Sequence, residues 1–436
     1  MSSNRGKGAS GKKSSGSRGA KPASGRSTKS AGGSANSRND SVSRAIKKAA
    51  KAAKSARRAS APKLKPLVYL LVFAAAFVFA YIYDTQSYAL SDFFGDVIYR
   101  ELFPKQASVP GGALLSEGEL KIHFVDVGQG DSAIVQFPDG KHMVIDGGPR
   151  SSRYALESYV RHLSVTHFDY VMLTHTDEDH CGGLAYLLED SKITFGQIFM
   201  PDITPEQVST VIYRRFYQAA EALAAKGTVI THSHSLTDIE TDAYIFDIIT
   251  PLADEYASLN HKSSEQLNAI SPIALLNFGN RSIMFTGDAN ERSESNFLNV
   301  VSAGSMPQSY YSADVLKVGH HGSKSSTMPE FLNAVTPGHA VISYGQNNKY
   351  GHPAPEVLVR LETYMPLQNI YGTGAQGSIV LAVGDTDGDG DFELNFTVSN
   401  PDAAVISVKL ERFYVLEAGA SRRGRYMLQI TVSAGK

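Results

Sequence analysis

The sequence predicts an α/β protein in which β-sheets are covered by helices. Short β-like runs alternate with helical stretches through residues 119–398, and the turn Pro138-Asp139-Gly140 joins two of the runs as a hairpin. Such alternation is typical of layered sheets packed against helices. A further observation is that several of the predicted strands end in Asp, Gly or His.

The elements of the folded body follow one another closely. Strands are predicted at residues 121–127, 132–137, 142–145, 169–173, 243–249, 273–278, 282–286, 315–318 and 340–344. Helices are predicted at residues 152–163, 183–188, 205–226 and 356–365, with Thr204 as the N-cap of the third. Two β-like runs within residues 399–436 predict a small strand-rich C-terminal extension.

The first 65 residues differ sharply from the rest in charge. They hold 18 Lys and Arg against one acid, Asp40, whereas the remaining 371 residues hold 24 basic and 42 acidic residues. Because Ser, Gly, Ala, Lys and Arg dominate residues 1–65, this segment buries too little apolar surface to order itself, and we expect a disordered tail. Its charge favours anionic lipid or nucleic acid as a partner, and a solvated tail without a fixed partner is the alternative.

Residues 66–83 form an uncharged apolar run that reaches the length of a single transmembrane helix. Tyr81 and Tyr83 would lie at one membrane interface. The positive-inside rule places the basic tail in the cytoplasm and the body outside, so we expect a single-pass protein of the cell membrane. A cleaved signal peptide is the alternative, although about 65 residues precede the run. Residues 84–118 are interpreted as a tether.

The segment that follows the predicted strand 169–173 gathers potential metal ligands within six residues. They are His175, Asp177, Asp179 and His180. Because they lie on a loop leaving a strand end, side chains of both parities can turn toward one point. Imidazole and carboxylate together suit Zn, Mn or Fe. The single cysteine of the chain excludes an intramolecular disulfide and a cysteine-rich zinc site.

Polar side chains also follow four other predicted strands. They are Asp146, Asp288, the pair His320 and His321, and His352. Taken alone, a Gly-Asp pair usually marks a turn, and a His pair is often a surface feature. Their recurrence at strand ends, together with the cluster at 175–180, favours one shared site.

These segments resemble a known family. HFVDVGQGDSAIVQFPDGKHMVIDGG (residues 123–148), LTHTDEDHCGGL, FTGD and VLKVGHHGSKSS are similar to the metallo-β-lactamase-fold hydrolases, in particular to the soluble C-terminal domain of the competence protein ComEC. The resemblance covers about residues 119–385, and the motifs occur in the order of the family. It implies an αββα sandwich with a two-metal site at one edge of the sheets, and hence a hydrolase domain at residues 119–398.

The resemblance also implies a ligand scheme. His175 and Asp177 would hold one metal, Asp179 and His180 the second, Asp288 would bridge both, and His321 would complete the second site. His320 is an alternative ligand, and Asp146 would orient a ligand from beneath. Asn268 matches the position where many members carry another histidine.

Two divalent ions are therefore expected, Zn or Mn, with Mg as a further alternative. Asp177 stands where most members have a histidine, and the additional oxygen ligand favours Mn or Mg over strict Zn selection. Two such ions activate a water for in-line displacement. On this scheme Asp179 and His352 take part in catalysis, and Ser323 and Lys324 could contact a phosphate; a structural role is the alternative for the last three.

The sequence thus predicts a membrane-anchored, metal-dependent hydrolase of phosphodiesters, with DNA as the substrate that the resemblance implies. The acidic body opposes this substrate, because counterion-driven DNA binding needs a basic surface. A small phosphoester, a lactone or a β-lactam is an alternative substrate. A non-catalytic surface-binding module is a third hypothesis, whose expected mark would be lost ligands.

Residues 385–391 (DTDGDGD) form a second acidic segment, with carboxylates at alternating positions as at the start of a Ca²⁺-binding loop. Position 12 of such a loop falls on Phe396, where a bidentate Glu is required. We interpret the segment as a polar hairpin turn, with an opportunistic Ca²⁺ site as the alternative.

Overall fold

The computed structural model describes residues 47–48, 51, 65–88, 92, 108–111, 118–208, 210–234, 237–257, 263–304, 306–401, 405–413 and 425–433. The prediction of a disordered tail at 1–65 therefore falls almost entirely outside the described residues, and so does most of the tether predicted at 84–118. The chain divides into two units, Met1–Phe79 and Ala80–Lys436, of which the second contains the sheets.

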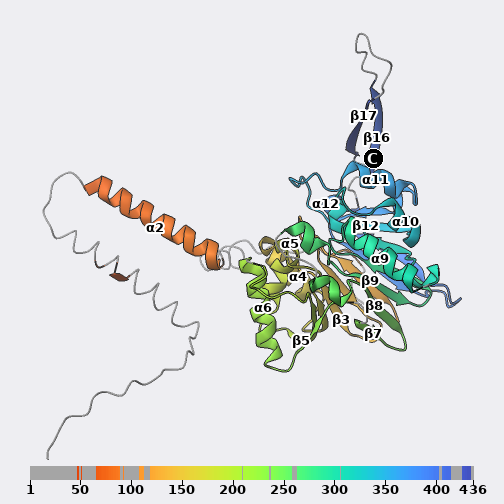
Figure 1. Cartoon of the computed structure of the whole chain (residues 1–436), viewed down its shortest axis with the longest axis horizontal. Coiled ribbons are helices and arrows are strands. Elements are labelled where there is room, and N and C mark those ends of the chain that lie inside the picture. The colour runs from red at the N-terminus through yellow and green to blue at the C-terminus, as the bar shows by residue number, and fades with distance from the viewer. Residues whose placement is uncertain are drawn as a thin grey trace, which may run out of the picture. The chain divides into compact units, whose positions relative to one another are not determined.

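Two sheets form the body of the second unit (Figure 1). The first has the strand order β15-β14-β1-β2-β3-β4-β5-β6 and consists of β1 (Leu120–Phe124), β2 (Ala133–Gln136), β3 (His142–Ile145), β4 (His167–Met172), β5 (Thr194–Met200), β6 (Val229–His232), β14 (Ile379–Gly384) and β15 (Glu393–Val398). The second has the order β13-β12-β11-β10-β9-β8-β7 and consists of β7 (Thr237–Glu240), β8 (Tyr244–Thr250), β9 (Ile273–Phe278), β10 (Arg281–Phe285), β11 (Val315–Lys317), β12 (His339–Ile342) and β13 (Ile370–Gly372).

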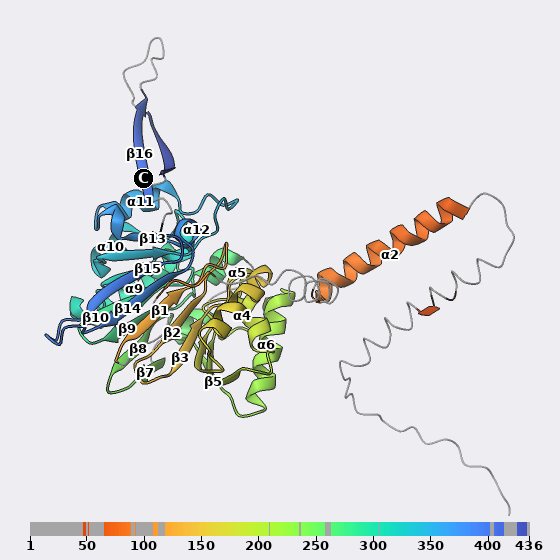
Figure 2. The same ribbon diagram turned by 180° about the vertical axis from the view of Figure 1, so that it is seen from behind.

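Helices lie on the outer face of each sheet, as the view from behind also shows (Figure 2). The longer ones are α4 (Arg153–His162), α5 (Glu178–Leu187), α6 (Val211–Ala224), α9 (Glu291–Ala303), α10 (Pro329–Val335) and α11 (Pro355–Glu362). Shorter ones are α7 (Ala253–Ala257), α8 (Ser264–Asn268) and α12 (Thr373–Gln376), with 3₁₀ turns η2 (Arg150–Ser152), η3 (Gln308–Tyr310), η4 (Gly319–Gly322) and η5 (Leu367–Asn369).

Three buried cores hold the four layers together, and strand alternation explains how. In β10, Ile283 and Phe285 face the first sheet, whereas Met284 faces the outer helices. The middle core joins the two sheets. The outer cores join one sheet to α4–α6 and the other to α9–α11. The expected αββα arrangement follows directly from this period-2 alternation.

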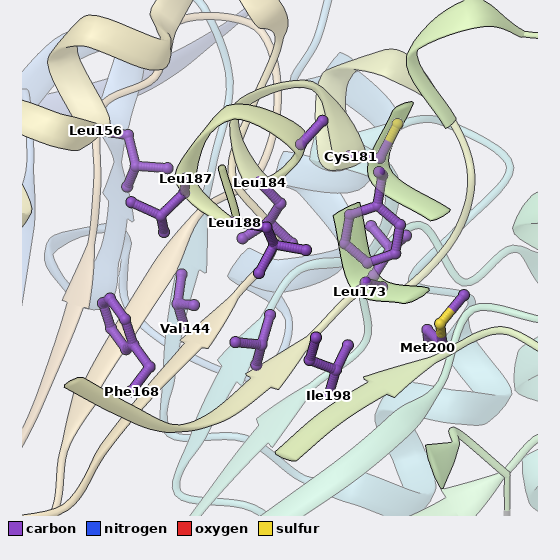
Figure 3. Packing of buried hydrophobic residues seen from close by; sticks show 14 of the residues in the cluster. Val144, Leu156, Phe168, Leu173, Cys181, Leu184, Leu187, Leu188, Ile198 and Met200 are labelled. Carbon is purple, nitrogen blue, oxygen red and sulfur yellow. The ribbon is translucent and has the colours of Figure 1, made fainter. Parts of the chain in front are cut away.

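Figure 3 shows the outer core beneath α5. Leu184, Leu187 and Leu188 pack over the apolar side chains of β3 to β5. Cys181, the single cysteine, is a free, buried thiol in this core. Its burial among apolar groups assigns it to packing.

Two helix boundaries differ from the sequence predictions. The helix predicted at 183–188 begins instead at Glu178, with Asp177 as N-cap and two acids in its first turn, where the helix dipole favours them. Gly182 and Gly183 do not delay the helix; a Cβ on Gly183 would lie 2.0 Å from Gly147 O, so they permit close packing on the loop after β3. The helix predicted at 205–226 begins at Val211 with Thr210, not Thr204, as N-cap.

Preceding the body, α2 (Lys65–Ser87) covers the apolar run at 66–83. Leu70, Phe73 and Phe77 on this helix are exposed. Among the residues that the structure describes, there is no helix whose length and apolar character would allow it to cross a membrane. The transmembrane helix stays a prediction.

Two smaller features precede and follow the sheets in the sequence: contacts of Asp92 and a two-stranded ribbon. Asp92, within the predicted tether, accepts hydrogen bonds from Tyr186 Oη at 2.6 Å and Arg215 Nη1 at 2.7 Å. At the other end, β16 (Val405–Phe413) and β17 (Arg425–Ser433) pair as a separate antiparallel ribbon, so the extension at 399–436 contains two strands.

Candidate metal centre

The predicted ligands converge because they follow parallel strands of both sheets. β3 and β4 run parallel in one sheet, and β10, β11 and β12 run parallel in the other. Carboxyl ends of parallel strands meet at one edge of a sheet, where open α/β folds place their ligands. The residues that follow these ends are Asp146, His175, Asp288, His320 and His321.

Asp288 lies at the centre of the cluster, and its two oxygens face different histidines. Oδ2 lies 3.7 Å from His175 Nε2 and 3.6 Å from His320 Nε2. Oδ1 lies 3.2 Å from His180 Nε2 and 3.5 Å from His321 Nε2. A carboxylate in this position can bridge two cations, one on each side.

The histidines are oriented from behind. His180 Nδ1 donates to Asp146 Oδ2 at 2.7 Å, and His321 Nδ1 donates to the carbonyl of Ser343 at 3.0 Å. Asp146 is itself fixed by Thr174, whose N and Oγ1 donate to its two oxygens at 2.8 and 2.7 Å. Since Nδ1 of both rings is engaged behind the site, Nε2 is the atom that faces the centre and that can bind a metal once it is deprotonated.

Several buried polar atoms at the centre have no hydrogen-bond partner within the described part of the chain. They are Nε2 of His175, His180 and His321, Oδ1 of Asp131, Oδ1 of Asp288 and Oδ1 of Asn268. A buried polar atom without a partner costs free energy, so a cluster of such atoms indicates a ligand-binding site. Lone pairs of imidazole and carboxylate fit a divalent cation.

The pKa shifts of His180 and Asp179 also agree with a cation-binding site. Burial opposes charge on His180, but Asp288 and Asp146 outweigh it and hold its pKa well above the usual value. Burial likewise opposes the charge of Asp179, yet its contact with His321, 3.4 Å from Nε2 to Oδ2, lowers its pKa to about 2. The acids around His180 thus favour positive charge at the centre, and Asp179 is ionised at neutral pH and available as a ligand.

Unusual backbone geometry aims two of the histidines. His320 and His321 have φ of 48° and 55°, the left-handed region that side chains with a Cβ rarely adopt. Each such residue costs about 1–2 kcal/mol. The turn η4 places both rings near Asp288 from consecutive positions, which a helix or a strand would not do. We interpret this backbone strain as a consequence of the site.

The cluster includes one carboxylate that sequence reasoning missed. Asp131 contributes a ligand atom to a set that also includes His180, Asp288 and His321, all within 4.8 Å of one another. Its Oδ2 accepts a hydrogen bond from Lys317 Nζ at 2.7 Å, and both side chains of this pair are buried. The signal available was the GQGD turn, but its partner lies 186 positions away.

An open cleft of about 670 Å³ gives access to the centre. Asp177, Asp179, Asn268, His320 and His352 line it. Asn268 Nδ2 lies 3.4 Å from the ring of His320. His352 stacks on His321 with centroids 6.2 Å apart, and burial followed by its two histidine neighbours lowers its pKa to about 4, so the ring is neutral at pH 7.

The two predicted phosphate contacts do not line this cleft. The Ser323 hydroxyl is largely buried and lies 3.1 Å from Ser325 Oγ, and Ser325 lines the cleft instead. Lys324 is exposed, and its carbonyl accepts a hydrogen bond from Arg360. Their contact with substrate stays a prediction.

Comparisons with known proteins agree with this fold and site. The sequence profile described as the metallo-beta-lactamase superfamily matches residues 125–194, which include the cluster at 175–180. The chain is a metallo-β-lactamase-fold protein, and its fold and site are those of a metal-dependent hydrolase.

Among curated proteins, the similarity is to competence proteins. ComE operon protein 3 of Bacillus subtilis is 30% identical over 271 residues, which cover 58% of this chain and 31% of that protein. Recombination protein 2 of Haemophilus influenzae is 27% identical over 256 residues, covering 57% and 27%. The chain is thus ComEC-like, and the match spans less than a third of the length of these relatives. Among solved structures, the metallo hydrolase Igni18 of Ignicoccus hospitalis has a TM-score of 0.35 and 15% identity, covering 60% of this chain and 98% of that one.

Proposed function

We propose that the body of this chain is a metal-dependent phosphodiesterase that acts on DNA. One observation carries the proposal: within the described part of the chain, Nε2 of three histidines and Oδ1 of Asp288 are buried without hydrogen-bond partners, and Asp288 and His321 line an open cleft. A surface-binding module would not need to keep such a costly arrangement. The DNA substrate rests on the similarity to competence proteins.

The geometry suggests how the chain would hold two ions. His175 and His320 would bind on the Oδ2 side of Asp288, and His180 and His321 on its Oδ1 side. Asp179, beside His321, would serve the second position. Asp177 lines the same cleft and, by the family resemblance, would serve the first. Two divalent ions in such a site lower the pKa of a water and stabilise the oxygens of an in-line displacement.

The remaining residues orient the reaction. Asp146 and the Ser343 carbonyl retain the Nδ1 protons of His180 and His321, so these rings do not turn during turnover. His352, neutral at pH 7, can donate a hydrogen bond to the leaving oxygen from the wall of the cleft. Burial of the ligands excludes bulk water except through the cleft, which strengthens each electrostatic contact.

The test uses the full chain in mild detergent, stripped of metal and reloaded with Mn, Zn or Mg. Cleavage of single- and double-stranded DNA would be compared with cleavage of a small phosphodiester, a lactone and a β-lactam. Asp179→Ala and His321→Ala serve as inactive controls. Metal-dependent DNA cleavage that both variants lose supports the proposal. Turnover of a small substrate without DNA cleavage would keep the site and reassign the substrate, and absence of both metal binding and turnover would leave the non-catalytic module.

We also propose that residues 66–83 anchor the chain in the cell membrane, with the basic tail in the cytoplasm and the hydrolase outside. The exposed apolar side chains of α2 and the +17 charge that precedes them support this arrangement. The tail would then contact anionic lipid or cytoplasmic nucleic acid. Carbonate extraction of membranes, followed by protease protection of an N-terminal tag, tests the anchor and its orientation; release of the chain by carbonate contradicts it.

A further inference from the structure

Tyr350 occupies the junction of two adjoining clefts. One is the cleft over the metal ligands, and the other, of about 900 Å³, lies beside it. Both are lined by Gln129, Asp177, Asp179, Ser264 and Tyr350. The Tyr350 side chain is 57% exposed, a large apolar ring offered to whatever passes from one cleft to the other.

The loop that presents this ring is held by one side chain. Asn348 Nδ2 donates to the carbonyls of Gly345 and His352, at 2.9 and 2.6 Å. Its Oδ1 accepts from the backbone N–H of Tyr350 and of His352, at 3.1 and 3.0 Å. Gly345 N in turn donates to Gln129 Oε1. The exposed ring is thus pre-organised, which reduces the entropy lost when a ligand stacks on it.

A series of stacked rings connects Tyr350 to the metal ligands. Tyr350 stacks on His352 with an interplanar angle of 22° and centroids 5.7 Å apart. His352 stacks on His321 at 29° and 6.2 Å. The ring of Tyr350 is therefore separated by one ring, that of His352, from the proposed metal ligand His321. A base stacked on Tyr350 could then belong to the nucleotide beside the reacting phosphate.

The acidic lining of the clefts disfavours binding through phosphates, so affinity for a nucleic acid would have to come from stacking of its bases. The second cleft is lined by the acids Asp126, Asp177, Glu178 and Asp179. Among the described residues that line either cleft, the Lys and Arg side chains are Arg292 and Lys349, and Lys349 Nζ lies 5.0 Å from the centroid of the Tyr350 ring. Contacts between basic side chains and phosphates are the usual source of affinity for nucleic acid, and few basic side chains line these clefts.

We propose that Tyr350 is a stacking platform for a nucleobase of the substrate, adjoining the scissile phosphate. This rests on the proposed phosphodiesterase function and adds to it the group that the site recognises. Aromatic side chains bind single-stranded nucleic acid by stacking on the bases, regardless of sequence. Because a duplex keeps its bases stacked on one another, the platform selects unpaired nucleotides.

The first experiment compares two substrates that differ only in their bases. Full-length wild type and Tyr350→Ala would be assayed on a single-stranded oligodeoxynucleotide and on an abasic oligomer of equal length. Loss of one stacked base weakens binding about 5-fold to 150-fold, so we expect KM for the oligodeoxynucleotide to rise by that factor, whereas KM for the abasic oligomer should not rise; any change in kcat that passes through His352 should be the same on both substrates. Tyr350→Phe, which keeps the ring, should retain the wild-type KM.

The second experiment uses the absence of tryptophan from the sequence. Tyr350→Trp introduces a single indole at the proposed platform, whose emission can be excited apart from that of the tyrosines. Its fluorescence in the full chain, with Asp179→Ala added to prevent cleavage, should be quenched as the oligodeoxynucleotide is titrated in and should not change with the abasic oligomer.

The outcomes separate this inference from the proposed function. DNA cleavage with equal KM changes on both substrates, or no quenching by the oligodeoxynucleotide, would overturn the platform and leave the phosphodiesterase intact. If wild type cleaves no DNA, the proposed function fails, and the titration alone decides: quenching restricted to the oligomer with bases supports a base-binding platform, and absence of quenching rejects it.

Discussion

Two clusters of potential metal ligands in this chain are equally compact, but they differ in burial and in hydrogen bonding. Asp131, His180, Asp288 and His321 bring one ligand atom each within 4.8 Å of one another, and so do Asp385, Asp387 and Asp389 in the loop between β14 and β15. The first cluster is buried and the second is exposed. Distance alone would assign both as cation sites.

Hydrogen bonding separates them. In the loop, Asp385 accepts from the N–H groups of Gly388 and Gly390, at 2.7 and 3.0 Å, and Asp389 accepts from Asp391 N at 2.8 Å. These carboxylates hold a turn. In the buried cluster the atoms that face the centre have no such partners among the described residues. Burial with unmet hydrogen-bonding capacity, rather than proximity of acids, is the mark of a site that needs a ligand.

The largest expected effect comes from Asp288→Asn. The amide removes the charge that both halves of the centre share, so tight metal binding should be lost, with a larger drop in affinity than the roughly 10- to 100-fold typical of changes behind the ligands. The loss of metal affinity is measured by the metal content after dialysis and by the rise in Tm on adding Mn or Zn. In the variant this rise should disappear. If Asp288→Asn kept both the bound metal and the metal-dependent rise in Tm, Asp288 would not be a metal ligand.

The next effect concerns the ion pair beneath the centre. Lys317→Met leaves the Asp131 carboxylate buried without its partner, which should reduce the free energy of unfolding by about 3–5 kcal/mol. Adding Asp131→Asn should recover part of that loss, because the unpaired charge is then gone. Urea denaturation of the metal-free single and double variants provides the measurement. Equal stability of Lys317→Met and wild type would show that the pair contributes no stability.

These two clusters also show what a sequence can and cannot predict. Local order is sufficient to propose the cluster at 175–180 and Asp288 as ligands, because each follows a strand and the motifs occur in a familiar succession, and the structure brings His175, His180 and Asp288 together. The DTDGDGD segment is interpreted as a turn because position 12 of a Ca²⁺ loop falls on Phe396, and its backbone hydrogen bonds agree with a turn.

What the sequence could not predict depends on packing between distant segments. Asp131 joins the centre only because β11, with Lys317, packs opposite the GQGD turn. The sequence predicts a loop at 175–180 because the segment leaves a strand end, but α5 already begins at Glu178, and Gly183 within that helix permits close packing on Gly147. The left-handed backbone of His320 and His321, which brings both rings to Asp288, has no signal in residue type.

A smaller effect separates two carboxylates with similar partners and different burial. Glu294 accepts hydrogen bonds from the N–H of Thr327 and Met328, yet burial raises its pKa to about 7. Glu393 accepts from Thr386 N near the surface, and that hydrogen bond lowers its pKa. Since the folded protein holds the proton on Glu294 more tightly than the unfolded chain, its stability should fall as pH rises from about 4.5 to 7, by roughly 3 kcal/mol.

Denaturation of wild type and Glu294→Gln across pH 4.5–8 measures this dependence. The amide cannot ionise, so its curve should lack the fall that wild type shows in this range. Glu393→Gln is the matched control and should keep the wild-type slope. Parallel curves for wild type and Glu294→Gln would place the ionisation of Glu294 outside this range.

The smallest expected effect tests the exposed cluster directly. Replacing Asp385, Asp387 and Asp389 together by Asn should change the stability by no more than a few tenths of a kcal/mol per site, as is usual for exposed positions, because Asn can still accept the backbone hydrogen bonds of the turn. Metal content and turnover should equal those of wild type, and Ca²⁺ should not raise the Tm of either protein. A Ca²⁺-dependent rise in Tm that the triple variant loses would show that closeness of carboxylates is sufficient for a site even without burial, and it would reverse the distinction drawn between the two clusters.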